Sequence, residues 1–341
     1  MKTGNRGEYL SMRLSLIARI SVFTALVFQA TALSGCSFKR YAINTIGDSL
    51  SEGVSVYETD PDIDLIGEAL PFSLKLLETL LAESPKHKGL LLSACKGFTL
   101  YSYVYVQQEA EMEAGNDLAR QRAMNLRARG LLLRALDYGV RGLDVAHPGF
   151  RDAFAKSTRG ALKTMKRGDV PMLYWCATAL GLAISSSRGD AEMIARLPEV
   201  DAMLARAIEL DPDWQEGTLH EFKLILAGAR PSMSAEDTAG IGKSYERALS
   251  LSGGRRASLF VSYAEAVCVK AQDRVAFRGM LDRALAIDPD REETLRLANH
   301  VSQRRARWLL GRIDDLFLEP EEPAPKAAPT TDTAPPAVPV P

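Results

Sequence analysis

The segment MLARAIELDPDW, Met203 to Trp214, decides the fold. Its apolar residues recur with the 3.6-residue period of a helix, an Arg-Ala pair lies near its middle, and Asp-Pro follows as a turn. Two later segments have the same arrangement, SYERALSLSGG from Ser244 and LDRALAIDPD from Leu281. A small alanine lets one helix approach its neighbour closely, and Asp-Pro ends one helix and begins the next. The pattern therefore predicts helical hairpins.

The hairpins recur along the chain. Aligning Ala207, Ala248 and Ala284 gives steps of 41 and 36 residues, which is the tetratricopeptide period of about 34 residues with a few inserted. Nearer the N-terminus, LPFSLKLLETLLAESP from Leu70 has leucines at i, i+4, i+7 and i+11, and Pro85 ends that helix. We predict an all-α domain of degenerate tetratricopeptide-like hairpins, of the solenoid type.

One segment, FTLYSYVYVQ from Phe98 to Gln107, also fits a strand. Tyr101, Tyr103 and Tyr105 alternate as strand residues do. However, Phe98, Tyr101 and Tyr105 also share one helical face, and both flanking segments read as helix. We interpret the segment as helix, with Tyr103 pointing away from the other three aromatic residues.

The N-terminus has the features of a secretory leader. An uncharged run of about fourteen residues, Ile20 to Leu33, is shorter than the roughly 20 residues that a membrane-spanning helix needs. The following Ser34-Gly35-Cys36 resembles a bacterial lipobox, so Cys36 is the predicted lipid attachment point that tethers the protein to a membrane. The alternative is an ordinary signal cut near Ala32 with an incidental cysteine. Basic residues precede the run: Lys2, Arg6, Arg13 and Arg19.

We divide the chain into a leader at 1–35, a lipidated tether at 36–44, the helical domain at 45–318 and a Pro-rich tail at 319–341. Ser37 after the cysteine favours the periplasmic face of the outer membrane, although anchoring to the inner membrane stays open. The tail holds eight of the seventeen prolines and no aromatic residue. Such a composition predicts disorder, and we favour a spacer over a binding segment.

Charge and motifs exclude several classes of function. The net charge is −1, and the leader carries four basic residues and Glu8, so the remaining chain is near −4. No basic surface is available for nucleic acid. Phosphate-loop, dinucleotide-binding, nucleophile-elbow and zinc-protease motifs are absent from the sequence, which predicts no enzyme, no catalytic residues and no cofactor. LHEFKL begins like a zinc-protease motif, but Leu224 stands where the second histidine would be, so His220 is expected to be an ordinary helix residue.

Metal binding is not expected either. Cys95, Cys176 and Cys268 are far apart in apolar segments and are expected to be buried thiols, with a Cys95–Cys176 disulfide as the alternative. An acidic cluster in YETDPDIDLIGEALP lacks the glycine and distal glutamate of a calcium loop. We interpret these carboxylates as a helix start. The cluster consists of Asp60, Asp62 and Asp64.

Aromatic side chains concentrate in FTLYSYVYV and in VPMLYWCATAL from Val170. Aromatics at helical spacing are usually core residues; the alternative is the lining of a cavity or channel, since Tyr and Trp combine an apolar face with a polar tip. The candidate pore-lining residues are Phe98, Tyr101, Tyr103, Tyr105, Tyr174 and Trp175.

The basic run QRRARWLL from Gln303 has two readings. It is either a solvated capping helix or an edge that docks a partner protein. The candidate docking residues are Arg304, Arg305 and Arg307.

Taken in order, several long stretches resemble the TatT family of lipoproteins associated with TRAP (tripartite ATP-independent periplasmic) transporters. They include QRAMNLRARGLLLRALDYGVRGLD, VPMLYWCATALGLAISSSRGD and NHVSQRRARWLLGRIDDLF, and the resemblance runs from about Thr45 to Phe317. It implies an all-helical fold with cryptic tetratricopeptide-like repeats, a hydrophobic pore and assembly as a homo-oligomer, a trimer. It also implies docking of a periplasmic solute-binding receptor and handling of an apolar, lipid-like ligand.

Two functions are therefore weighed. In the first, the protein is a TRAP-associated lipoprotein that binds a receptor and an apolar ligand. In the second, it is a structural scaffold for envelope assembly with all its aromatics in the core. A filled core at Tyr103, Tyr174 and Trp175 would favour the scaffold, and we favour the first function.

Overall fold

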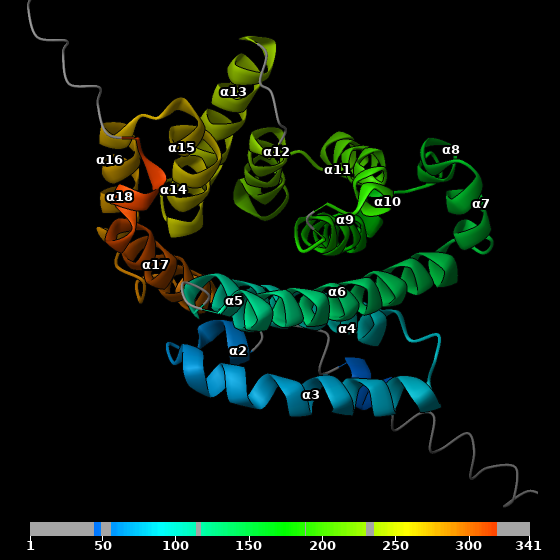
Figure 1. The fold of residues 1–341 in the computed structure, drawn as a ribbon. Helices are drawn as coiled ribbons and strands as arrows, with labels where there is room; N and C mark the ends of the chain where they lie inside the picture. Colours follow the sequence, from blue (N-terminus) through cyan, green and yellow to red (C-terminus); the bar gives the residue numbers. More distant parts are fainter. Residues whose placement is uncertain (1–43, 49–55, 114–116, 188, 230–234, 319–341) are drawn as a thin grey trace, which may run out of the picture.

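The computed structural model describes residues 44–48, 56–113, 117–187, 189–229 and 235–318, and every secondary-structure element in these ranges is helical (Figure 1). The predicted all-α class is confirmed. The leader, Cys36 and the Pro-rich tail lie outside the described residues.

The first part of the chain forms long helices that pack on one another in sequence order, α3 on α4, α4 on α6, α6 on α9 and α9 on α11. Their hydrophobic faces make the larger of two core clusters. The elements are α2 Val56–Thr59, α3 Ile63–Glu83, α4 Lys88–Ser102, the π-helix η1 Tyr103–Gln107, α5 Gln108–Glu113, α6 Leu118–Ala146, α7 Phe150–Lys156, α8 Thr158–Leu162, the 3-10 helix η2 Arg167–Asp169, α9 Val170–Ser185, α10 Ala191–Ile194 and α11 Leu197–Leu210.

The second part continues with shorter helices, in which α12 packs on α13 and α14 packs on both α16 and α17. Together with α18, they enclose the smaller core cluster. The elements are the 3-10 helix η3 Trp214–Gly217, α12 Thr218–Gly228, α13 Ala235–Ser252, α14 Ala257–Tyr263, the π-helix η4 Ala264–Cys268, α15 Val269–Ala271, α16 Arg274–Leu285, the 3-10 helix η5 Glu293–Leu295, α17 Arg296–Gly311 and α18 Ile313–Leu316.

Local interactions determine where helix α3 begins and ends. Asp62 caps its N-terminus, because a carboxylate oxygen accepts hydrogen bonds from the backbone N–H groups of Asp64 at 3.1 Å and Leu65 at 3.0 Å. The helix ends at Glu83, two residues before Pro85. In the described residues, no group of three or more ligand-type side chains is placed to hold a metal ion.

The repeated alanines do pack as close-contact positions. Ala207, Ala248 and Ala284 are all buried. A Cβ placed on Gly217 would lie 2.8 Å from the Cα of Ala248, so the backbone of η3 touches the backbone of α13. Gly217 also has a φ of 94°, which favours glycine. Helical hairpins are observed, while the assignment to the tetratricopeptide class stays a prediction.

The ends of the helical array meet, which the sequence did not predict. In α17, Arg296 Nη1 donates to the Thr59 carbonyl at 2.8 Å, and Arg305 Nη2 lies 2.7 Å from Glu111 Oε2. Figure 1 shows α17 running back toward α2 and α5. Because α17 thus contacts the N-terminal helices, the array closes into a ring, whereas an open solenoid leaves its two ends apart.

A further sequence expectation concerns the cysteines. Cys95, Cys176 and Cys268 are free and buried, which confirms the prediction of buried thiols over the alternative of a Cys95–Cys176 disulfide. Among the residues that the structure describes, no helix combines the length and the apolar character needed to span a membrane.

Candidate functional site

Two π-helices supply the inner side of the ring with polar side chains. In η1 the N–H of Gln108 bonds to the carbonyl of Tyr103, and in η4 the N–H of Val269 bonds to the carbonyl of Ala264. This wider turn changes the direction of the side chains that follow, and such segments are frequent at functional sites. Tyr103 lies in the first segment and Glu265 in the second.

The phenol of Tyr103 lies in a buried, charged environment. Its pKa is raised to about 12, mainly by burial and next by the carboxylate of Glu265, while Arg305 opposes this rise. The side chain of Gln108 acts on the same phenol and lowers its pKa. The hydroxyl of Tyr103 in η1 is therefore influenced by side chains from α5, η4 and α17.

A second tyrosine, Tyr174 of α9, belongs to the same interior. Burial raises its pKa to about 12, with Glu221 of α12 as the next cause and Tyr103 as a further one. The Glu221 carboxylate accepts hydrogen bonds from the hydroxyls of Ser258 and Ser262, both at 3.1 Å. The two tyrosines are therefore close enough for Tyr103 to affect the pKa of Tyr174. A carboxylate side chain of the protein acts on each phenol, Glu265 on Tyr103 and Glu221 on Tyr174.

Arg305 of α17 forms ion pairs with residues of α5 and η4. Its Nη2 donates to Glu265 Oε1 at 2.6 Å and lies 2.7 Å from Glu111 Oε2, and its guanidinium carbon is 4.4 Å from the ring centre of Trp308. A guanidinium that is paired with two carboxylates and stacked on an indole is held in one position. It links α17 to both α5 and η4.

Glu265 is partly accessible and has a raised pKa. Its side chain keeps 32% of its surface accessible, yet burial raises its pKa above the ordinary value of 4.5 although Arg305 opposes this rise. Burial therefore outweighs the attraction of the paired guanidinium at this carboxyl. Tyr103 and Tyr174 combine partial exposure with a raised pKa in the same way.

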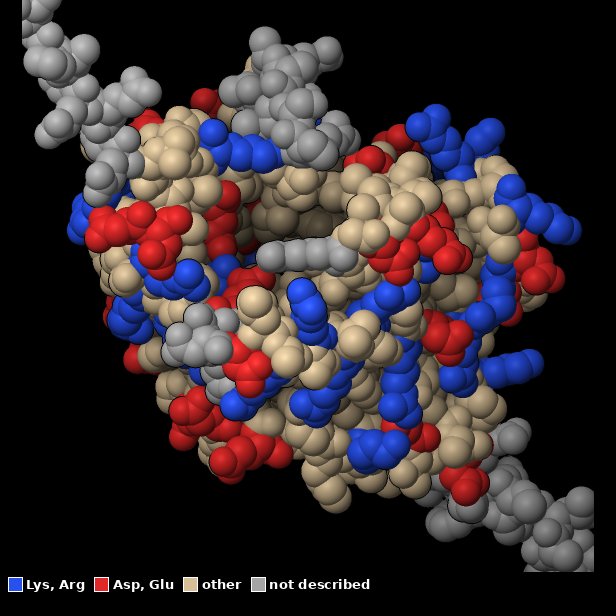
Figure 2. Space-filling view, in the orientation of Figure 1, with Lys and Arg blue, Asp and Glu red and all other residues tan. Residues whose placement is uncertain are grey.

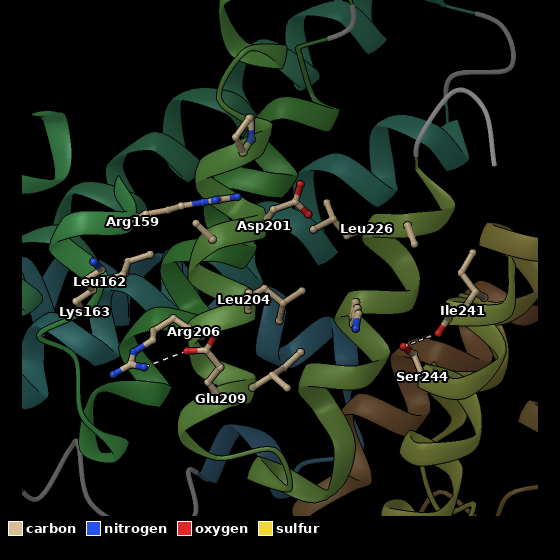
Figure 3. A pocket seen from close by; sticks show the side chains of 17 residues that line it. Arg159, Leu162, Lys163, Asp201, Leu204, Arg206, Glu209, Leu226, Ile241 and Ser244 are labelled. Carbon is tan, nitrogen blue, oxygen red and sulfur yellow. Dashed lines mark hydrogen bonds and ion pairs between the residues drawn. The ribbon is translucent and has the colours of Figure 1, made fainter. Parts of the chain in front are cut away.

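Figure 2 shows the molecule hollowed between α12 and α11. A groove of about 1040 Å³ is lined by residues of α8, α11, α12 and α13. Figure 3 shows that apolar side chains, among them Leu204, Leu226 and Ile241, form part of its wall. Arg206 at the wall is paired with Glu209 at 3.0 Å. The groove has the size of a small-molecule site.

The six aromatic candidates from the sequence do not all lie together. Phe98 is buried and stacks on Tyr138 of α6 at 5.8 Å between ring centres. Tyr101 stacks on Tyr105 at 5.9 Å, and the Tyr105 hydroxyl donates to the carbonyl of Ile63 at 2.8 Å. These three residues pack toward α3 and α6, whereas Tyr103 faces Glu265 and Arg305. The expected opposite orientation of Tyr103 is therefore observed.

Tyr174 and Trp175 contact each other at 5.0 Å between ring centres. Tyr174 also packs on Trp214 at 4.9 Å, while Trp175 has Lys96 at 6.0 Å from its ring. Only Tyr103 and Tyr174 of the six candidates belong to the charged interior. Whether any of the six contacts a ligand stays a prediction.

Sequence reasoning missed the polar residues of the interior, chiefly Gln108, Glu221 and Glu265. Glu221 and Glu265 each stand within a helical segment rich in apolar residues, LHEFKLIL and LFVSYAEAVC. A carboxylate on an apolar helical face was the available signal. The π-helices that direct these side chains inward have no comparable signal in the sequence.

The three arginines of the basic run have different environments. Arg304 lies 3.4 Å from Glu109 and Arg305 is bound as described, so both interact within the chain. Arg307 is exposed. Docking of a partner stays a prediction, and the exposed Arg307 is the member whose position suits it. Elsewhere, His220 Nε2 lies 3.0 Å from the Pro212 carbonyl, which makes it a helix residue with a local partner.

The helical elements, which α17 closes into a ring, define the class: an all-α protein. Within that class, the chain belongs to the family described as TRAP transporter T-component, whose family model matches residues 59–317. An uncharacterized protein from Treponema pallidum (strain Nichols) is 30% identical over 304 residues, which are 84% of this chain and 94% of that protein. The resemblance seen in the sequence is confirmed. The family is associated with transport, is not a known enzyme family, and indicates a protein of the periplasmic side.

Proposed function

We propose that this protein is a lipid-anchored periplasmic component of a TRAP transporter that docks a solute-binding receptor and holds an apolar small ligand inside its helical ring. The observation that carries the proposal is the group of partly accessible polar side chains Tyr103, Tyr174 and Glu265 on helices of a closed array, in a chain of the T-component family.

The proposal assigns different roles to the aromatic candidates. Tyr103 and Tyr174 contact the ligand directly. Phe98, Tyr101, Tyr105 and Trp175 pack behind them and hold the wall in place. The apolar groove between α11 and α12 gives the ligand its route of entry.

The proposed anchor is lipid on Cys36, with the protein on the inner leaflet of the outer membrane. Mutation of Cys36 to Ser is expected to release the protein from the membrane fraction and to abolish incorporation of labelled fatty acid. Membrane association that persists in this variant would contradict lipid anchoring.

Native mass spectrometry of the mature chain from Ser37, purified gently, tests the ligand and the assembly together. We expect a homo-oligomer, a trimer, whose mass exceeds that of the bare chains by a co-purifying apolar molecule. Solvent extraction and a second mass measurement then identify the molecule. A ligand-free species after purification without detergent would favour the alternative, a structural scaffold for envelope proteins.

A further inference from the structure

We propose that helix α3 lies on the membrane that anchors the protein, with the side chains of Leu65, Phe72 and Leu76 inserted among the lipids. We call these three side chains the outer α3 face. The inference rests on the proposed function, because it takes a lipid on Cys36 as the anchor.

The outer α3 face is apolar and accessible. Leu65 is 53% exposed, Phe72 75% and Leu76 43%. Residues seven apart in a helix are nearly two full turns apart, and residues four apart are little more than one turn apart, so the three side chains project from one side of α3. Leu74 and Leu81 project from the opposite side, where each is 3% exposed and belongs to the larger core cluster. Helix α3 therefore has two apolar faces, of which the described residues cover one.

The proposed tether begins at the C-terminal end of the same helix. Ser84, the residue that follows α3, donates through its hydroxyl to Asn44 Oδ1 at 2.8 Å, and His87 Nε2 lies 3.2 Å from the Asn44 carbonyl oxygen. The chain from Cys36 to Asn44 can extend no more than about 28 Å, because each residue adds at most ~3.5 Å. Since α3 is itself about 32 Å long, a lipid on Cys36 keeps this helix near the surface of the bilayer.

A bilayer fits the outer α3 face better than a second copy of the chain does. Three side chains in a single row along one helix make a narrow surface, whereas a stable protein–protein interface takes roughly 20–30 residues from each partner. Figure 1 shows α3 along the lower edge of the molecule, so a flat surface can reach the whole row. The tether also holds this face at a high local concentration beside the lipids, and insertion of a few apolar side chains is then sufficient for contact.

The charges of α3 indicate which lipids suit the contact. The helix carries one lysine, Lys75, and four acidic residues, and Lys75 Nζ lies 2.6 Å from Glu78 Oε2. Because α3 has no surplus of positive charge to attract anionic lipids, burial of apolar surface is the source of affinity. Vesicles of zwitterionic phosphatidylcholine are therefore the appropriate probe.

Quenching by lipids tests the position of α3 in the full lipidated protein, reconstituted on phosphatidylcholine vesicles. An environment-sensitive fluorophore is attached to Phe72→Cys or, as the matched control, to Val275→Cys on α16, where the native valine is 84% exposed. Cys95, Cys176 and Cys268 are buried, so labelling is confined to the introduced thiol. We expect nitroxide-labelled lipids to quench the fluorophore at position 72 about threefold more strongly than at position 275.

The outcomes separate this inference from the proposed anchor. Equal quenching at the two positions in vesicle-bound protein would overturn the membrane contact of α3 and leave the lipid anchor intact. A purified full chain without lipid on Cys36 would contradict the anchor and the inference together.

Vesicle flotation of the unlipidated chain from Ser37 measures the contribution of the outer α3 face without the anchor. Leu65→Ser, Phe72→Ser and Leu76→Ser combined should lower the floating fraction about tenfold, with folding checked by circular dichroism. Val275→Ser is the control and should float as the parent does. Unchanged flotation of the triple variant would overturn the membrane assignment. If that variant also lost the oligomer in native mass spectrometry, a second copy of the chain would be the occupant of the face.

Discussion

At the scale of single residues, Gly139 shows how closely α6 is packed. A Cβ at this position would lie 2.3 Å from Cys176 Sγ in α9 and 3.0 Å from Cys95 Sγ in α4. We expect Gly139→Ala to lower the free energy of unfolding by about 1–3 kcal/mol, because both buried thiols must move. Urea denaturation measures the change.

Gly130 provides the matched control in the same helix. Nothing lies within 4 Å of a Cβ placed there. Gly130→Ala should therefore raise the stability by about 0.5–1 kcal/mol through helix propensity. A loss of similar size in both variants would show that crowding at Gly139 is not the cause.

Glu78 gives a prediction that depends on pH. Burial acts to raise its pKa, but Lys75, Tyr138 and Arg134 together hold the pKa below the ordinary 4.5. The Tyr138 hydroxyl donates to Glu78 Oε1 at 2.7 Å. A lowered folded-state pKa means that the carboxylate stabilises the fold above about pH 4.5 and that this contribution disappears as the pH falls through the folded pKa.

We expect Glu78→Gln to destabilise the protein by about 1–3 kcal/mol at pH 7. The difference from the parent should shrink steadily as the pH is lowered below 4.5, where the parent also becomes neutral at this position. Urea titrations at several pH values measure it. A difference that is independent of pH would point to packing and would contradict the electrostatic explanation.

At the scale of elements, the start of α3 separates two interpretations of an acidic cluster. Asp62→Ala should lower stability by about 1 kcal/mol, since the variant loses the side chain that caps α3. Asp64→Ala is the control: its carboxylate is 90% exposed and lies 3.5 Å from Arg304, so a change within about 0.5 kcal/mol is expected. Thermal denaturation measures both.

The same experiment includes calcium. Added calcium should leave the midpoint of the parent unchanged, because the three carboxylates serve the helix start. A midpoint that rises with calcium in the parent, and not in Asp62→Ala, would show that the cluster is a metal site.

The sequence predicted most elements for local reasons. Period, caps and prolines locate α3, α11, α13 and α16, and they identify Phe98 to Gln107 as helical. They do not show that this segment continues as the π-helix η1. Formation of this π-helical turn depends on the distant residues that Tyr103 and Gln108 contact, and local residue preferences do not indicate it.

At the scale of the whole molecule, Arg305 joins the last long helix to the rest. Arg305→Ala leaves Glu111 and Glu265 without their shared partner, and removal of one member of a buried ion pair costs about 3–5 kcal/mol. We expect this loss in urea denaturation, together with faster hydrogen exchange in α17.

Arg307→Ala serves as the control in the same helix. Because Arg307 is exposed, this substitution should change the free energy of unfolding by no more than about 0.5 kcal/mol. If the basic run docks the receptor, this variant should instead weaken receptor binding. A large loss of stability in Arg307→Ala would contradict the assigned environments.

The sequence by itself determined the helical class and the hairpins, because periodicity, small residues and turn residues act within a few positions of one another. Its resemblance over long stretches indicated the family. The sequence also showed which faces are apolar. Only the tertiary structure decided that α17 returns to α2 and α5, and that Tyr103 meets Glu265 and Arg305. The physical reason is separation along the chain: the pattern of one helix records that a face is covered, but the identity of the distant residues that cover it depends on how all the helices pack together.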